Sequence, residues 1–253
     1  MTFTKRQPPK QQKKLLFTRP FCLKENRYMA TIYFCGDPHG RFDHLIQVVT
    51  HGKPDAIILL GDLTPTQPLQ DVLAPILGLT EVWFIHGNHD TDSEPNYDHL
   101  FSSALADRNL HGRVVEIAGV RIAGLGGVFR RQVWMPPAAP SFQSPDAYCA
   151  QCGRGNLWRG GLPRKHRSTI FPADFEHLKG QHADILVTHE APSCHPHGFQ
   201  VIDDLARDMG VTMAFHGHHH DHLDYSPCWA DLGFQAYGVG LQQITDNSGA
   251  IIG

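Results

Sequence analysis

The sequence contains few cysteines and no long hydrophobic run. Six cysteines among 253 residues are too few for a disulfide scaffold, so we expect reduced thiols, as in cytoplasmic proteins. No apolar run approaches the roughly 20 residues needed to cross a bilayer, and the first 28 residues lack the apolar segment of a secretory signal. These absences exclude membrane-spanning and disulfide-stapled classes and predict a soluble, cytoplasmic protein with no membrane partner.

Charge is also scarce, and it is unevenly distributed. Charged residues make up 19% and hydrophobic residues 41% of the chain, which is typical of a folded globular protein. Residues 1–28 contain eight Lys/Arg and one Glu, a net charge of +7. Because the whole chain has a net charge of −3, residues 29–253 carry −10. Proteins that hold long nucleic-acid backbones normally present a basic surface, so the acidic body makes nucleic acid an unfavoured partner.

The first 28 residues differ in composition from the rest. They are rich in Lys, Gln and Pro and show no helical or alternating periodicity, whereas a buried-strand pattern begins at residue 31. We therefore expect a disordered basic tail over 1–28 and a folded domain over 29–253. The sequence leaves two explanations of the tail open: Met29 is the true start, or the tail has a targeting role.

From residue 31, strand patterns alternate with helical patterns. Strands are predicted at 31–36, 56–60 and 82–86, with helices at 41–50 and 68–77, and this alternation predicts an α/β layered fold with a partly parallel sheet. Further strands are predicted at 113–117, 120–125, 184–188, 212–216, 234–239 and 249–252, enough for two sheets. The segment 129–171 has little periodicity and several Pro and Gly residues, so we expect a long insertion between core elements.

Potential metal ligands directly follow the first three predicted strands. The segments are GDPHG with Asp37 and His39, GD with Asp62, and GNHD with Asn88, His89 and Asp90. An Asp before a helix is often only an N-cap, but parallel strands bring their carboxyl ends to one edge of a sheet, where ligands bind. Carboxylate and imidazole donors together suit Mn, Fe or Zn.

Two histidine motifs follow later strands. His189 comes after DILVT, and the segment GHHH places His218 and His220 two residues apart. Residues two apart in extended chain share a side, so His218 and His220 face one way and His219 the other. The spacing therefore selects His218 and His220 as the ligand pair.

The ordered series DxHG, GD, GNHD, H and GHxH resembles the signature of the calcineurin-like metallophosphoesterases. The five motifs run from Asp37 to His220 and span most of the folded chain. The resemblance implies a four-layer αββα sandwich of two mixed β-sheets flanked by helices. It also implies two divalent metal ions, with Mn favoured and Fe, Zn, Co or Ni as alternatives.

The resemblance also implies a role for each motif residue. One ion would be held by Asp37, His39, Asp62 and His220, and the other by Asp62, Asn88, His189 and His218. A hydroxide that bridges the two ions would attack the phosphate ester in line. His89 and Asp90 would be the catalytic residues: His89 would protonate the leaving group, and Asp90 would orient His89.

The substrate class is predicted from a difference within the family. The protein Ser/Thr phosphatases read GDxVDRG and GNHE, whereas this chain reads GDLTPT and GNHD and lacks their phosphate-holding arginine. We therefore expect a small phosphomonoester, phosphodiester or nucleotide-like substrate. Basic residues of the insertion are candidates for binding its phosphate: Arg130, Arg131, Arg159, Arg164 and Arg167. A solvated basic loop is the alternative interpretation.

Two other functions stay open. One is a non-catalytic binding scaffold with this fold, although such a protein would normally have lost metal-ligand residues. The other is a metal-dependent nuclease, which would conflict with the acidic body. Cys149 and Cys152 form one CxxC without a second pair, so spacing selects neither a structural zinc site nor a redox site, and their role is left open. Oligomeric state is not encoded in any of these patterns.

Overall fold

The first sheet is built from the apolar segments that follow residue 30. A computed structural model, which describes Met1 and residues 30–253, gives its strand order as β3-β2-β1-β9. The strands are β1 (Ile32–Cys35), β2 (Ala56–Leu60), β3 (Glu81–Ile85) and β9 (Ile244–Asp246). The first three run parallel, and β9 pairs antiparallel with β1. The central strand β2 is apolar throughout because both of its faces are buried.

The second sheet follows in the chain and has the order β4-β5-β6-β7-β8. Its strands are β4 (Arg113–Ile117), β5 (Val120–Leu125), β6 (Ile185–Thr188), β7 (Met213–His216) and β8 (Gln235–Gly238). β4 and β5 form an antiparallel hairpin, whereas β5 to β8 are parallel. The two sheets therefore each contain parallel strands and one antiparallel edge strand.

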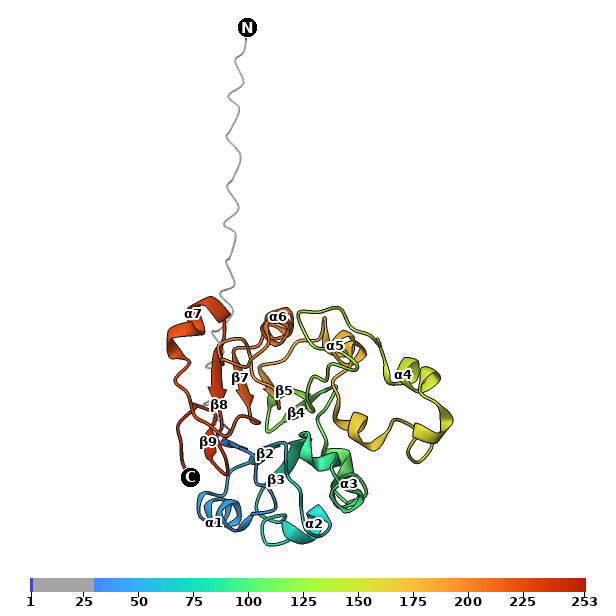
Figure 1. Ribbon diagram of the computed structural model, residues 1–253. Coiled ribbons are helices and arrows are strands. Elements are labelled where there is room, and N and C mark those ends of the chain that lie inside the picture. The colour runs from blue at the N-terminus through green and yellow to red at the C-terminus, as the bar shows by residue number, and fades with distance from the viewer. Residues whose placement is uncertain (2–29) are drawn as a thin grey trace.

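Helices cover the outer faces of both sheets (Figure 1). The α-helices are α1 (Asp43–Gly52), α2 (Leu69–Val72), α3 (Glu94–Phe101), α4 (Pro145–Gln151), α5 (Pro172–Leu178), α6 (Gln200–Met209) and α7 (Trp229–Leu232). The 3-10 helices are η1 (His89–Thr91), η2 (Ala106–Arg108), η3 (Arg154–Asn156), η4 (Arg164–Ser168) and η5 (Ser226–Cys228). One apolar cluster joins the first sheet to α1, α2 and α3, and another joins the second sheet to α5 and α6.

The inner faces of the sheets form the central core. Phe34 of β1 and Phe215 of β7 are fully buried, and their rings stack with centroids 3.7 Å apart. Aliphatic side chains of both sheets surround this pair. The layers are thus helix, sheet, sheet, helix, which confirms the predicted αββα sandwich.

Two predicted elements differ from the structure. The helix predicted at 68–77 is helical only over Leu69–Val72, because Pro75 cannot continue it. The strand predicted at 249–252 is replaced by β9 at Ile244–Asp246, followed by a turn in which Gly249 has φ +81. Ile251 contributes an isolated bridge to Thr245.

No helix of the described residues is long and apolar enough to span a bilayer. The tail predicted at 1–28 lies, apart from Met1, outside the described residues.

We expect Phe215→Ala to reduce the free energy of unfolding by about 3–5 kcal/mol, because the cavity would lie between the sheets. Urea unfolding followed by circular dichroism measures this change. Leu77→Ala is the control, since Leu77 is 38% exposed, and it should change the value by less than about 1 kcal/mol. Equal losses in the two variants would contradict a core between the sheets.

Candidate metal centre

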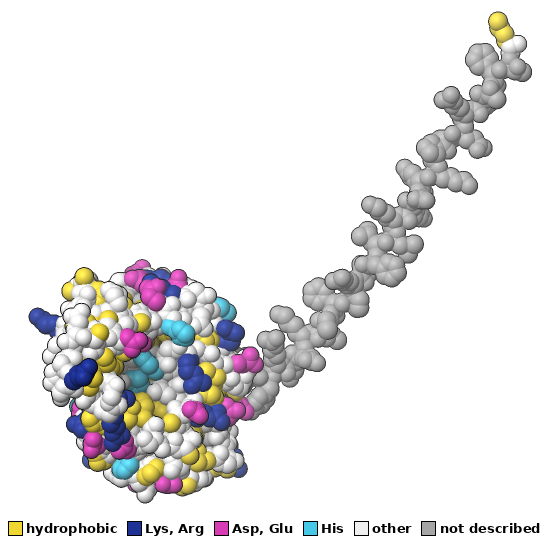
Figure 2. Space-filling model, turned by 90° about the vertical axis from the view of Figure 1, so that its right-hand side faces the viewer, with side chains coloured by type: hydrophobic (Ala, Val, Ile, Leu, Met, Phe, Trp, Pro, Cys, Tyr) yellow, Lys and Arg dark blue, Asp and Glu magenta, His cyan; other side chains and the backbone are white. Residues whose placement is uncertain are grey.

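The predicted ligand turns converge because they all follow the carboxyl ends of parallel strands. Asp37 and His39 follow β1, Asp62 follows β2, Asn88 and His89 follow β3, His189 follows β6, and His218 and His220 follow β7. These strands belong to both sheets, so the two sheets contribute to one site. Figure 2 shows histidine side chains near the centre of one face, with Lys and Arg side chains around them.

The first ligand cluster contains Asp37, His39, Asp62 and His220. One ligand atom from each lies within 4.8 Å of the others. His39 Nε2 and His220 Nε2 are 3.0 Å apart, and His220 Nε2 is 3.2 Å from Asp37 Oδ2. Two carboxylates and two imidazoles that point at one another form a donor set suited to a divalent transition metal.

The second cluster contains Asp62, His189 and His218, whose ligand atoms also lie within 4.8 Å of one another. His189 Nε2 is 3.4 Å from Asp62 Oδ2. The side-chain oxygen of Asn88 is buried and lacks a hydrogen-bond partner within the described residues. Asp62 belongs to both clusters, so its carboxylate lies between them.

Buried polar atoms without partners show that these residues fit metal ions. Among the described residues, Asp37 Oδ1, Asn88 Oδ1 and His189 Nε2 are buried and make no hydrogen bond. Such atoms are costly unless a ligand satisfies them. His189 Nδ1 donates to the carbonyl of Leu60 at 2.7 Å, so Nε2 is the nitrogen that faces the site and can bind a metal in place of a proton.

The electrostatics of the site also favour a cation. Burial would lower the pKa of His189, but the carboxylates of Asp62 and Asp37 raise it to about 10. Burial would likewise raise the pKa of Asp62, yet the charge and hydrogen bond of His189 hold it below its usual range. Two carboxylates that attract a proton onto a fully buried imidazole equally attract a bound cation.

Unusual backbone conformations place the ligands. His39, Asp62, His218 and His220 all have positive φ, between +44 and +72. Glycines let neighbouring turns approach: a Cβ at Gly87 would collide with Asp62 Oδ1, and a Cβ at Gly217 would collide with Asp37 Oδ1. The Gly residues of the motifs are therefore required by close packing around the ligands.

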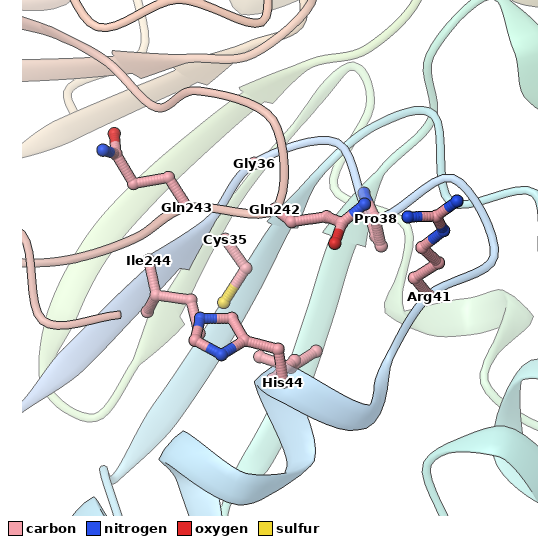
Figure 3. Close-up of a pocket in the computed structure, with 9 residues that line it drawn as sticks. Cys35, Gly36, Pro38, Arg41, His44, Gln242, Gln243 and Ile244 are labelled. Carbon is pink, nitrogen blue, oxygen red and sulfur yellow. The ribbon is translucent and has the colours of Figure 1, made fainter.

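A small cavity lies behind the first ligand turn (Figure 3). It is lined by Cys35, Pro38, Arg41, His44 and the chain from Gln242 to Ile244. Its volume of about 10 Å³ is near the minimum for one water molecule and is too small for a substrate.

The structure corrects the predicted orienting role of Asp90. Asp90 is fully buried and accepts hydrogen bonds from the backbone N–H groups of Thr64 and Gly87, each at 2.8 Å. Asp92 instead accepts the hydrogen bond from His89 Nδ1, at 2.5 Å. Asp90 thus joins two ligand turns, whereas Asp92 orients His89. The i,i+3 spacing of His89 and Asp92 is the sequence signal that could have identified this pair.

Glu190 is a second residue that the sequence motifs did not identify. Its carboxylate is buried, accepts from the N–H of Phe129, and has Oε2 3.9 Å from His218 Nε2. Burial raises its pKa to about 7. Its only signal in the sequence is its position next to His189.

The five candidate arginines of the insertion lie in three environments. Arg130 is partly buried beside the site and donates to the hydroxyls of Ser168 and Thr169. Arg131 is exposed. The other three contact the segment from η1 to α3: Arg164 donates to backbone carbonyls, Arg167 to the Tyr97 hydroxyl, and Arg159 to Asp98.

The insertion is thus packed against the protein by the residues that suggested substrate binding. Trp158 donates to Glu94, and the guanidinium groups of Arg159 and Arg167 lie over its ring, 4.3 and 4.9 Å from the centroid. Arg159, Arg167 and Trp158 therefore have a structural explanation at α3.

The fold and the two ligand clusters together define a metal-dependent phosphoesterase. The family model described as calcineurin-like phosphoesterase matches residues 30–222, and the chain belongs to this family. It is accordingly a metallophosphoesterase, from a family that generally uses divalent metals.

Two of the similar proteins illustrate the relationship. The chain is 47% identical over 218 residues to an uncharacterized protein of Haemophilus influenzae, and the match covers 86% of this chain and 94% of that protein. The crystal structure of TT1561 from Thermus thermophilus is 16% identical, with a TM-score of 0.52, over 88% of this chain and 97% of that one. The latter similarity shows a shared fold.

We expect Asp90→Asn to lower the free energy of unfolding by about 1–3 kcal/mol, because the amide group cannot accept both buried backbone N–H groups. Asp92→Asn is the matched control: Asp92 is exposed, so stability should change by less than about 0.5 kcal/mol while turnover falls. Urea unfolding and steady-state kinetics separate the two effects. The reverse pattern would restore Asp90 as the orienting residue.

Proposed function

We propose that this metallophosphoesterase hydrolyses a small phosphomonoester, phosphodiester or nucleotide-like substrate in the cytoplasm, with two divalent ions bound at adjacent positions. The observation that carries the proposal is the sharing of Asp62 by two ligand clusters. One site would use Asp37, His39, Asp62 and His220, and the other Asp62, Asn88, His189 and His218. Two cations so bound would polarise the phosphate and lower the pKa of a water molecule.

The chain's own residues would move the leaving-group proton. His89 Nδ1 is bound to Asp92, so Nε2 is the nitrogen that can carry a proton to the leaving oxygen. The His89 ring lies 5.5 Å from the ring of His39, next to the first ligand cluster. Asp92 also holds the imidazole ring in place through this hydrogen bond, and general-acid catalysis depends on such positioning.

Arg130 is the insertion arginine best placed to bind substrate phosphate. Burial lowers its pKa, and the nearby charges of Asp92, Glu190 and Asp62 oppose that change, so its guanidinium lies in the electric field of the site. A guanidinium can bind phosphate through two parallel hydrogen bonds. Exposed Arg131, the next residue, would supply further positive charge near the entrance.

The donor set leaves several metals as candidates. The two clusters contain oxygen and nitrogen donors, with no thiolate among them. Such sites accept Mn, Fe, Zn, Co or Ni, and we favour Mn because carboxylate and amide oxygens contribute beside the imidazoles.

Hydrolysis of model substrates tests the proposed reaction. We expect metal-stripped protein refilled with Mn to hydrolyse para-nitrophenyl phosphate or bis-para-nitrophenyl phosphate, and the preferred compound separates monoesterase from diesterase. His89→Asn should lower kcat for phenyl phosphate, whose leaving oxygen needs the proton, by about 10²–10⁴-fold without changing metal content. Asp62→Asn should abolish turnover. Absence of turnover with all five metals would refute the proposal and favour a binding scaffold.

Metal content tests the shared ligand separately. Elemental analysis should find two equivalents in the wild type and about one in His39→Ala and in His218→Ala, since each variant lacks one ligand of one cluster. Asp62→Asn should weaken both sites because Asp62 belongs to both. A single equivalent in the wild type would show a mononuclear site.

A further inference from the structure

The insertion 129–171 holds the turn that carries His89. Arg164, at the start of η4, donates from Nε to the carbonyl of Thr91 at 3.1 Å and from Nη2 to the carbonyl of Asp92 at 2.8 Å. The guanidinium therefore binds two consecutive peptide groups of the His89 turn. One of these peptides belongs to Asp92, whose side chain accepts the hydrogen bond from His89.

A buried hydroxyl pair gives a second connection. Ser168 Oγ, at the other end of η4, is 2.7 Å from Thr91 Oγ1, and both residues are buried. Thr91 Oγ1 also donates to the carbonyl of Asn88 at 3.3 Å. Both ends of η4 thus contact the short segment from Asn88 to Asp92.

Helix α3 extends the same connection. Asn96 donates from its amide to the carbonyl of His89 at 3.2 Å. Arg167 bonds the hydroxyl of Tyr97, and Arg159 pairs with Asp98 at 2.5 Å. The insertion is therefore attached to the element that immediately follows the catalytic turn as well as to the turn itself.

The His89–Asp92 pair needs such support because it is exposed. The two side chains are 48% and 59% exposed, and an exposed ion pair by itself contributes little to holding a geometry. The position of Asp92 must therefore come from its backbone, and the backbone carbonyl of Asp92 is the group that Arg164 binds.

We propose that Arg164 is a positioning residue that keeps Asp92 against His89, so that the insertion controls the protonation of the leaving group. The inference rests on the proposed function. In the step concerned, a bond forms between the water oxygen and phosphorus while the bond from phosphorus to the leaving oxygen breaks. The proton on His89 Nε2 goes to the leaving oxygen, and the proton released by the water returns to the imidazole through solvent. Lys cannot replace Arg164, since an ammonium group lacks the planar fork that reaches two carbonyls.

The test compares two leaving groups. Phenyl phosphate has the more basic leaving oxygen, so its hydrolysis needs the proton. The leaving oxygen of para-nitrophenyl phosphate is less basic and needs the proton much less. Arg164→Ala and Arg164→Lys should lower kcat for phenyl phosphate by about 10-fold or more and for para-nitrophenyl phosphate by less than about 3-fold. KM, metal content and Tm should stay near wild type. Arg154→Ala, at an exposed arginine of the same insertion, is the matched control.

Other outcomes would overturn the inference. Equal loss on both substrates, or loss of metal, would give Arg164 a purely structural role, and a raised KM with unchanged kcat would make it a substrate ligand. In a His89→Asn background, Arg164→Ala should cause no further loss, so additive losses would also contradict it.

A readout without turnover keeps the two proposals distinct. The NMR resonance of the His89 Nδ1 proton that is bound to Asp92 should be present in the wild type, lost in Arg164→Ala and retained in Arg154→Ala. An unchanged resonance in Arg164→Ala would refute the positioning role even if no substrate is turned over. Absence of turnover in the wild type, with the resonance behaving as expected, would refute only the proposed function.

Discussion

Two buried carboxylates at the edge of the sheets constrain the rest of the site. Asp37 and Asp62 are 0% and 1% exposed, and a buried negative charge is stable only when hydrogen bonds and opposite charge compensate it. Each has one oxygen bound to a backbone N–H: Asp37 Oδ2 to His218 at 2.8 Å and Asp62 Oδ1 to His89 at 2.7 Å. The remaining oxygens face the imidazoles.

The same contacts join the two sheets. Asp37 follows a strand of the first sheet and binds the backbone of a turn from the second. His189 follows a strand of the second sheet and donates to Leu60 in the first. The stacked rings of Phe34 and Phe215 set the separation of the sheets a few residues away. The register of the core and the geometry of the ligands are therefore fixed together.

The sequence predicted the strands and the residues that directly follow the ends of the strands. β2, β4 and β5 have the predicted bounds, and most other strands differ by a residue at their ends, because alternating or continuous apolar patterns report burial directly. The seven proposed ligands lie around one site because parallel strands end at one edge. Features that arise from tertiary packing were not predictable: the partner of His89 and the contacts of the insertion depend on how α3 and η4 meet.

The arginines of the insertion illustrate this limit. Their composition suits phosphate and aromatic stacking equally well, and only the position of α3 decides that Arg159 and Arg167 lie over Trp158. Similarly, Asp90 and Asp92 are both plausible partners of His89 by sequence. The conformation of η1 directs one carboxylate into the protein and the other toward the imidazole.

The left-handed backbone at His39, Asp62, His218 and His220 has a consequence for the energetics of the whole protein. Each such residue costs about 1–2 kcal/mol relative to ordinary backbone, so four together approach the net stability of a typical domain, about 5–15 kcal/mol. The core between the sheets has to offset this strain before any cation arrives, and cation binding then adds stability that rises with the logarithm of the free cation concentration above Kd. The folded state and the loaded site are in this way thermodynamically linked, and metal supply would set how much properly folded protein a cell maintains.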